Sequence, residues 1–222
     1  MPGKLFIVAT PIGNVQDITL RALDILRQVD GIICEEERQG STLLKRLMIS
    51  PNELLTLNEH NEDDQTNALI TRLRQGQSLA LISDCGTPAF ADPGARLISE
   101  ALQFKIQVTT IPGPSSLMAA ISLSPIPLKE FMFVGFLPRK DPERITKLEY
   151  LRSLRVPLII LDTPYRLVKL MDEVQKVFGP KKLVTLGLDL TLPSEWVVHN
   201  TVHWIRQNIP VKKGEFVLII HR

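Results

Sequence analysis

The most constraining feature of this 222-residue chain is a series of short apolar runs that alternate with segments of helical periodicity. Residues 5–9 form a wholly apolar run that ends at a Pro/Gly turn, and residues 17–30 then place apolar side chains at helical spacing. The alternation continues with apolar runs at 31–35, 54–57, 79–83 and 108–111 and helical segments at 41–49, 65–75 and 95–102. Such a pattern predicts a mostly parallel sheet covered by helices on both faces.

The second half of the chain has a different order of elements. It begins with an apolar helical segment at 115–123, which a Pro-Ile-Pro break follows. After it the pattern predicts strands at 131–136 and 158–161, helices at 142–154 and 165–178, and late strand-like runs at 183–188, 196–200 and 215–220. Because these late strands are crowded together, we predict a mixed sheet. The expected fold is therefore α/β with two domains, residues 1–115 and 116–222.

Composition excludes several classes of protein. Hydrophobic residues make up 44% and charged residues 23% of the chain, which is typical of a globular protein. No signal-peptide pattern and no apolar stretch of membrane-spanning length occurs, so we expect a cytoplasmic protein without a membrane segment. Cys34 and Cys85 stand far apart without neighbours at ligand spacing, so neither a disulfide framework nor a structural metal is predicted.

The two halves differ in charge. Residues 1–112 hold 10 Lys/Arg and 14 Asp/Glu, a net charge of −4, whereas residues 113–222 hold 16 and 10, a net charge of +6. A basic half is one footprint of a polyanionic partner. A solvated surface of mixed charge is the alternative, and charge alone favours it.

Three loops rich in Pro and Gly follow predicted strands, at the edge where a parallel sheet binds its ligands. They span residues 10–14, 83–94 and 112–116. Glycine lets the backbone approach a ligand, and proline removes N–H groups, so these loops favour a cationic or neutral ligand over a phosphate. Neither of the common nucleotide-phosphate motifs occurs in them. One such turn is usually only a turn, but three at strand ends, with Asp84 and Asp92 in the longest, indicate a site.

Five motifs, mostly at these loops, resemble a known family. They are Ala9-Thr10-Pro11-Ile12-Gly13-Asn14, Ser83-Asp84 with Gly86-Thr87-Pro88, Asp92-Pro93-Gly94, Pro112-Gly113-Pro114-Ser115, and Gly135-Phe136-Leu137-Pro138-Arg139-Lys140. In this order, and over nearly the whole chain, they resemble the bacterial small-subunit (16S) ribosomal RNA cytidine 2′-O-methyltransferases, which belong to the tetrapyrrole methylase superfamily. The resemblance implies S-adenosylmethionine in a cleft between the two domains, ribosomal RNA or the 30S subunit as partner, and a homodimer.

The same resemblance implies which residues line the cofactor cleft. They are Thr10, Pro11, Gly13, Asn14, Ser83, Asp84, Gly86, Thr87, Pro88, Pro114, Ser115 and Ser116. Methyl transfer from a sulfonium is an in-line displacement, so catalysis depends chiefly on the orientation of donor and acceptor. Asp84 either hydrogen-bonds a donor on the cofactor or forms an Asx-turn that orients its own loop.

A 2′-hydroxyl acceptor gives up a proton as the methyl group arrives, and a nearby carboxylate or imidazole can take it. Two motifs offer candidates. In the Glu-Glu-Glu-Arg run at 35–38, Glu35 and Arg38 match the family. The Glu-His-Asn-Glu run at 59–62 matches the family at every position. We take Glu35, Glu59 and His60 as candidate catalytic residues. His60 acts as a base only if the neighbouring carboxylates approach it. The alternative is that both runs are solvated loops.

Basic residues are the candidates for contact with RNA phosphate, since Lys and Arg position a nucleic-acid backbone without reading its bases. The family match points to Arg38, Arg139 and Lys140. Arg144 begins the same predicted helix as these last two, and it is either a further contact or part of a solvated helix face.

Departures from the family concentrate in the second half. Residues 162–166 read Asp-Thr-Pro-Tyr-Arg and lose an imidazole, and Leu188 and Leu192 stand where the family has cations. Cys85 stands where alanine is common, which a small buried hydrophobe explains better than a reactive thiol. The lost cations leave two alternatives open, a small-molecule methylase of the same superfamily and a non-catalytic, ribosome-associated protein that binds S-adenosylmethionine.

Overall fold

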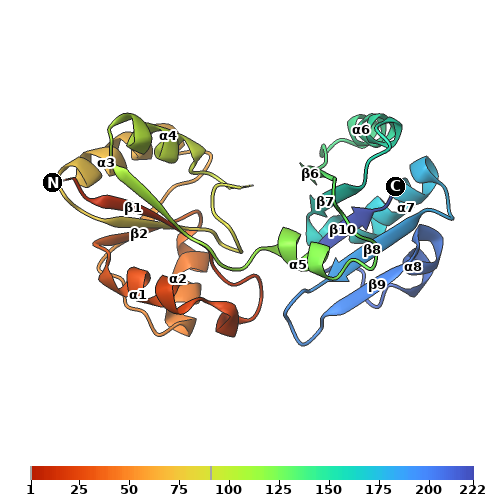
Figure 1. Ribbon diagram of the computed structural model, residues 1–222, viewed down its shortest axis with the longest axis horizontal. Coiled ribbons are helices and arrows are strands. Elements are labelled where there is room, and N and C mark those ends of the chain that lie inside the picture. The colour runs from red at the N-terminus through yellow and green to blue at the C-terminus, as the bar shows by residue number, and fades with distance from the viewer. Residues whose placement is uncertain (1, 91) are drawn as a thin grey trace. The chain divides into compact units, whose positions relative to one another are not determined.

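The computed structural model describes residues 2–90 and 92–222, and over these ranges the chain forms two five-stranded sheets. Sheet A belongs to a first unit that ends at Ser115, and sheet B to a second unit that begins at Ser116 (Figure 1). We call them unit 1 and unit 2. None of the helices in the described ranges is both long and apolar enough to cross a membrane.

Sheet A is parallel, as the sequence predicts. Its strands are β1 (Lys4–Val8), β2 (Gly31–Cys34), β3 (Leu54–Thr56), β4 (Leu79–Ile82) and β5 (Gln107–Ile111), in the spatial order β3-β2-β4-β1-β5. Every neighbouring pair of strands in this order is parallel. The loops that follow the strands therefore meet at one edge, and those after β4, β1 and β5 come from adjacent strands.

Helices cover both faces of sheet A (Figure 1). They are α1 (Leu20–Gln28), α2 (Glu37–Arg46), α3 (Glu62–Arg74) and α4 (Ala95–Gln103). Leu26 of α1 and Leu44 of α2 pack into one hydrophobic core, whereas Leu69 of α3 and Leu97 of α4 pack into the other. Because both faces are covered, β2 and β4 are buried along their whole length, which explains why they are wholly apolar.

Sheet B is mixed, again as predicted. Its strands are β6 (Met132–Phe136), β7 (Leu158–Asp162), β8 (Leu183–Leu188), β9 (Trp196–Thr201) and β10 (Phe216–Ile220), in the order β6-β7-β10-β8-β9. β6 pairs with β7 in parallel, and the other pairs are antiparallel. The helices of this unit are α5 (Ser116–Ser122), α6 (Asp141–Ser153), α7 (Leu167–Phe178) and α8 (Val202–Asn208). One core joins α6, α7 and α8 to the sheet.

Some helices differ from the prediction. The sequence pattern did not predict α8, because its seven residues are too few to show a period and follow β9 directly. A helix N-cap at Thr201, whose side chain accepts from the backbone N–H of Trp204, begins it. Helix α3 begins three residues before the predicted start, with the acidic residues Glu62, Asp63 and Asp64 in its first turn. Acidic residues favour a helix N-terminus although they carry no hydrophobic period.

Candidate active site at the carboxyl edge of sheet A

Thr10 ties the loop after β1 to the loop after β4. Its backbone N–H donates to the carbonyl of Gly86 at 2.8 Å, and its Oγ1 donates to the carbonyl of Ser83 at 2.9 Å. The side chain is fully buried. Thr10, which we predicted to line the cofactor cleft, thus has its hydroxyl engaged within the protein, and it acts by positioning two loops.

Gly86 joins all three Pro/Gly-rich loops. Its φ of +86° lies in the left-handed region, and a Cβ atom there would lie 3.2 Å from Ile12 Cγ2 and 3.8 Å from the carbonyl oxygen of Pro114. The next residue, Thr87, donates from its hydroxyl to the same carbonyl at 3.3 Å. The loops after β1, β4 and β5 are therefore packed against one another, as the parallel sheet requires.

The remaining cofactor candidates lie along these loops. Pro11 and Pro88 are buried, and the half-buried residues are Gly13, Asn14, Pro114, Ser115 and Ser116. Asn14 accepts a hydrogen bond from the backbone N–H of Gln16 at 3.0 Å and so caps a short 3-10 helix. Ser116 begins α5. One residue of the longest loop, Ala91, lies outside the described residues.

Two acidic side chains fix the longest loop, and neither is among the residues predicted to bind the cofactor or to act in catalysis. The buried Ser83 donates from Oγ to the carboxylate of Asp92 and accepts from the backbone N–H of Cys85 at 3.1 Å. At the far end of the loop, the backbone N–H of Gly94 donates to Glu62 Oε1 at 3.0 Å. The Glu-His-Asn-Glu motif thus holds the loop after β4 through its last residue, a contact across the chain that only the fold reveals.

Carboxylates from different loops meet at this edge. Glu35 follows β2, and burial raises its pKa to about 7, helped by the negative charges of Asp92 and Asp84. Glu59 and Glu36 contribute to the same increase. We call Glu35, Asp84 and Asp92 the carboxylate cluster. A carboxyl group whose pKa lies near neutrality is suited to accept a proton in catalysis.

One carboxylate oxygen of Asp84 has no partner among the residues that the structure describes. This oxygen is Oδ1, and it is buried. Burial raises the pKa of Asp84, whereas a hydrogen bond from the backbone N–H of Glu36 opposes that shift. An unsatisfied buried carboxylate oxygen is costly, so a ligand with a donor or a positive charge would be stabilised there.

His60 and Glu59 lie at the surface. The backbone N–H of His60 donates to Asn58 Oδ1 at 3.0 Å, which closes the turn before α3, and both side chains are exposed. The structure therefore brings Glu35 into the carboxylate cluster and leaves the imidazole outside it. Arg38 is exposed in the first turn of α2.

The loops at this edge bear the motifs that resemble one family, and comparison of the whole sequence with family models decides whether the chain belongs to it. A model of the family described as Tetrapyrrole (Corrin/Porphyrin) Methylases matches residues 4–205. The chain belongs to the tetrapyrrole methylase family.

Named relatives within this family cover nearly the whole chain. A protein of Xylella fastidiosa named Ribosomal RNA small subunit methyltransferase I is 40% identical over 223 residues, which cover 99% of this chain and 81% of the relative. The protein of the same name from Escherichia coli O157:H7 is 36% identical over 222 residues, which cover 98% of this chain and 77% of the relative.

Solved structures of tetrapyrrole methylases share the fold. Uroporphyrin-III C-methyltransferase from Thermus thermophilus, complexed with S-adenosylhomocysteine, aligns with a TM-score of 0.67 at 18% identity and covers 99% of this chain and 98% of that one. Cobalt precorrin-4 methyltransferase aligns with a TM-score of 0.68 at 19% identity, covering 98% and 94%.

The loops of this tetrapyrrole methylase fit a cofactor that carries a positive sulfonium and an amine. The unpartnered Asp84 Oδ1 offers an acceptor, and the carboxylate cluster offers negative charge. At Gly86 and Gly113 an added Cβ atom would lie 3.2 Å from a side-chain carbon and would displace that neighbour slightly, so the loops approach each other closely there. This chemistry agrees with the expected preference for a cationic ligand over a phosphate.

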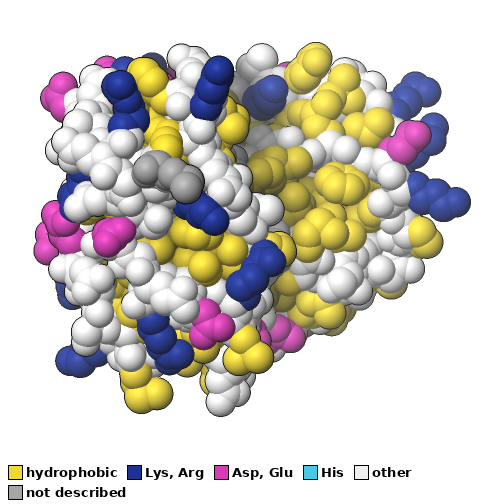
Figure 2. Space-filling view, turned by 60° about the vertical axis from the view of Figure 1, so that its left-hand side comes forward, with side chains coloured by type: hydrophobic (Ala, Val, Ile, Leu, Met, Phe, Trp, Pro, Cys, Tyr) yellow, Lys and Arg dark blue, Asp and Glu magenta, His cyan; other side chains and the backbone are white. Residues whose placement is uncertain are grey.

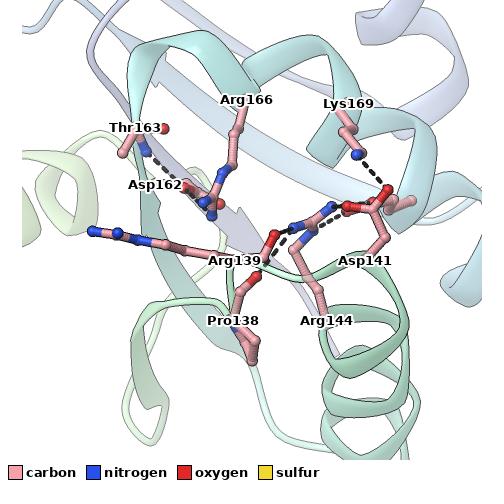
Figure 3. Close-up of polar contacts among 9 residues, drawn as sticks. Pro138, Arg139, Asp141, Arg144, Asp162, Thr163, Arg166 and Lys169 are labelled. Carbon is pink, nitrogen blue, oxygen red and sulfur yellow. Dashed lines mark hydrogen bonds and ion pairs between the residues drawn. The ribbon is translucent and has the colours of Figure 1, made fainter.

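In unit 2 the loop that follows β6 is held by Arg144 (Figure 3). This guanidinium is 1% exposed and donates to the carbonyls of Pro138 and Arg139 at 3.0 and 2.8 Å. It also pairs with Glu173, at 2.6 and 2.7 Å, and with Asp141 at 2.8 Å. The sequence offered two interpretations of Arg144, an RNA contact and part of a solvated helix face. Both are wrong, because the side chain is buried and its N–H groups donate to other residues of the protein.

The two other cations of this loop lie at the surface, where Lys140 pairs with Glu143 at 3.5 Å. Arg139 and Lys140 are exposed, and Figure 3 shows the side chain of Arg139 pointing away from the contacts of Arg144. Arg144 therefore serves the loop by fixing the backbone that presents them.

The departures from the family have different structural settings. Leu188 is 1% exposed and packs in the core of unit 2, so its replacement of a cation affects core packing, whereas Leu192 is 36% exposed. Tyr165, at the lost imidazole, is exposed, and the preceding Asp162 is buried and paired with Arg166 at 3.2 Å. Cys85 is exposed, so the expectation of a small buried hydrophobe is wrong. Its thiol donates to the carbonyl of Ile12 at 3.5 Å.

Proposed function

We propose that this protein transfers a methyl group from S-adenosylmethionine to a ribose 2′-hydroxyl of small-subunit ribosomal RNA. The observation that carries the proposal is the carboxylate cluster, with Glu35 at a pKa of about 7, beside three loops that bear the family motifs. The relatives that carry the name Ribosomal RNA small subunit methyltransferase I support ribosomal RNA as the substrate.

In the proposed reaction the protein has two tasks: it orients the cofactor, and it removes a proton from the acceptor hydroxyl. When bound, S-adenosylmethionine supplies an electrophilic methyl group on a positively charged sulfur. Asp84 accepts a hydrogen bond from the cofactor or opposes its charge through Oδ1, and the loops that pack at Gly86 orient it. Glu35, in its deprotonated form, takes the proton from the acceptor hydroxyl.

RNA binding uses cations that lie outside the carboxylate cluster. Arg38 at α2 and Arg139 and Lys140 after β6 are exposed, and each is suited to neutralise a phosphate. Arg144 keeps the last two in place, since it fixes the backbone of their loop.

We further propose that the enzyme works as a homodimer in the cytoplasm, where ribosomal RNA is its substrate. Figure 2 shows hydrophobic side chains gathered on the visible surface of unit 2. In unit 2, Met118 is 57% exposed and Phe136 is 55% exposed. Exposed apolar side chains in patches favour association with another protein surface.

The test is methyl transfer to a defined acceptor. Purified protein is incubated with methyl-labelled S-adenosylmethionine and 30S subunits from a strain that lacks 2′-O-methylation, and the RNA is digested to nucleosides. We expect label in a 2′-O-methylated nucleoside, and no label when subunits from the methylated parent strain are used instead.

Two outcomes would contradict the proposal. Label in a small molecule but not in RNA would identify a small-molecule methylase of the same family. Binding of S-adenosylmethionine without transfer to any RNA would identify a non-catalytic binding protein. Sedimentation of the purified protein at the concentration of the assay gives its mass. A monomer would refute the homodimer.

A further inference from the structure

Unit 2 contains a basic pocket that the proposed reaction does not use. Its volume is about 420 Å³, and it lies where the C-terminal ends of α6, α7 and β10 meet. The described residues that line it are Leu151, Arg152, Arg155, Val156, Phe178, Lys182, Ile220, His221 and Arg222. Within this lining set four side chains are Lys or Arg and none is a carboxylate. Four cationic side chains around one cavity favour an anionic ligand.

The ionisable groups of the pocket are crowded by positive charge. Burial lowers the pKa of Lys182, and the nearby Arg152 lowers it further. Burial likewise lowers the pKa of His221 to about 4, with His199 and Lys182 adding to the effect. In both groups burial is the main cause of the lowered pKa, and neighbouring positive charge adds to it. An anion in the pocket would offset that neighbouring positive charge.

Two side chains of the pocket are held in fixed positions. Arg152 donates from Nη1 to the carbonyl of Val177 at 2.8 Å, which orients its guanidinium. His221 is 3% exposed, and a hydrogen bond of 2.8 Å between its Nε2 and Thr185 Oγ1 holds the ring in place. His221 Nδ1 is buried without a hydrogen-bond partner among the described residues. The pocket therefore has an ordered polar wall and one unsatisfied nitrogen.

Arg155 occupies a backbone position that favours glycine. It follows the end of α6 with a φ of +53°, in the left-handed region where a side chain is strained. Glycine at this position would relieve the strain but would remove a cation from the pocket.

We propose that this pocket binds a phosphate group, and that the phosphodiester backbone of the RNA substrate supplies it. Planar guanidinium groups bind phosphate through paired hydrogen bonds, and the pocket holds three arginines among its described lining residues. Residues 113–222 carry a net charge of +6, which favours a polyanion over a single small ion. The assignment to RNA rests on the proposed function, whereas the affinity for phosphate does not.

The first arm of the test uses inorganic phosphate as the probe. Thermal unfolding of the full chain is followed as phosphate replaces chloride at constant ionic strength. The pocket variant is Arg155→Gly with Lys182→Gln, changes that relieve backbone strain and remove a half-buried charge, so it is expected to fold. Lys181→Gln is the matched control, because Lys181 is an exposed neighbour that does not line the pocket. Arg222→Gln, at an exposed residue, replaces the double variant if that one fails to fold.

We expect phosphate to raise the unfolding midpoint of the wild type and of Lys181→Gln, because a ligand that binds only the folded state stabilises it. The midpoint of the pocket variant should rise less, by only the general stabilisation that phosphate gives any folded protein. An equal increase in the pocket variant, or no increase in the wild type, would overturn the proposal.

The second arm identifies the source of the phosphate. Binding of small-subunit RNA is measured over a series of KCl concentrations for the same variants. Loss of one phosphate contact should reduce the slope of log affinity against log salt by about 0.7–0.9. A shallower slope in the pocket variant supports RNA as the source, and an unchanged slope with lost phosphate stabilisation supports a free phosphate-bearing ligand instead. Failure of the methyl-transfer assay with an intact phosphate response would count against the proposed function alone.

Discussion

At the scale of single residues, two glutamates two positions apart have opposite surroundings. Glu35 is half-buried beside Asp84 and Asp92, whereas Glu37 is exposed in the first turn of α2. We expect Glu35→Gln to lower the rate of methyl transfer by about 10²–10⁴-fold, since the amide cannot accept the proton. Glu37→Gln, the matched control, should retain the wild-type rate. Single-turnover assays with labelled cofactor measure both.

The pH dependence of the wild-type rate gives an independent check on Glu35. Because the deprotonated carboxylate is the active form, kcat/KM should rise with pH and level off above a pKa of about 7. A profile that is flat between pH 5.5 and 8.5, recorded under the same single-turnover conditions, would exclude Glu35 as the base.

The same carboxyl group should make the fold less stable at high pH. Its pKa is raised from 4.5 to about 7 on folding, so the folded state binds more protons than the unfolded state between these values. Stability therefore falls as pH rises through this window. Glu35→Gln should unfold at a higher temperature than the wild type at pH 8, and the difference should shrink toward pH 4.5. Calorimetric scans across this range test the sign, and a variant less stable at pH 8 would contradict it.

Asp84 provides a prediction about cofactor binding. Asp84→Asn removes the negative charge and leaves the size of the side chain unchanged. We expect the affinity for S-adenosylmethionine to fall by about 10–100-fold, the effect of losing a charged hydrogen bond of about 1.5–3 kcal/mol. Titration calorimetry compares it with Asp64→Asn, at an exposed position on α3. Equal affinities in the two variants would remove Asp84 from the cofactor site.

At the scale of elements, Arg144 on α6 pairs with Glu173 on α7 and so joins these two helices to the loop after β6. Arg144→Met leaves a buried carboxylate without its partner and should lower the free energy of unfolding by about 3–5 kcal/mol. Adding Glu173→Leu should recover most of that loss, because no unpaired charge then remains buried. Arg139→Gln, at an exposed side chain, should change stability by less than about 0.5 kcal/mol. Urea unfolding distinguishes these outcomes, and a tolerated Arg144→Met would refute the structural role.

At the scale of the whole molecule, acidic and basic residues are divided between the two halves of the sequence. Residues 1–112 carry a net charge of −4 and residues 113–222 a net charge of +6. Phosphate contacts release counterions, so RNA affinity should fall steeply as salt rises, and replacing Arg139 or Lys140 by Gln should make the slope shallower. Affinity for S-adenosylmethionine should change little over the same range. Salt titrations of RNA binding and of S-adenosylmethionine binding test this prediction. An equal fall in the two affinities would contradict it.

Local sequence patterns predict the helices and strands and the chemistry of the loops. Hydrophobic periodicity is a local property, so it located the strands of both sheets and most helices, and the motifs at 10–14, 83–94 and 112–116 marked the edge where the site lies. Only the tertiary structure decided which distant side chains meet. The strand order β3-β2-β4-β1-β5 places the end of β2 next to the end of β4 and so brings Glu35 to Asp84 and Asp92.

The same distinction explains the residues that were predicted wrongly. A charged or polar side chain has the same local pattern whether it is buried or exposed, so the sequence did not show that Arg144 is enclosed by α7 or that Cys85 faces outward. Burial depends on which elements pack together, and packing joins segments that are far apart in the chain. Local sequence patterns therefore set which helices and strands form, and long-range packing sets which side chains are buried and which are exposed.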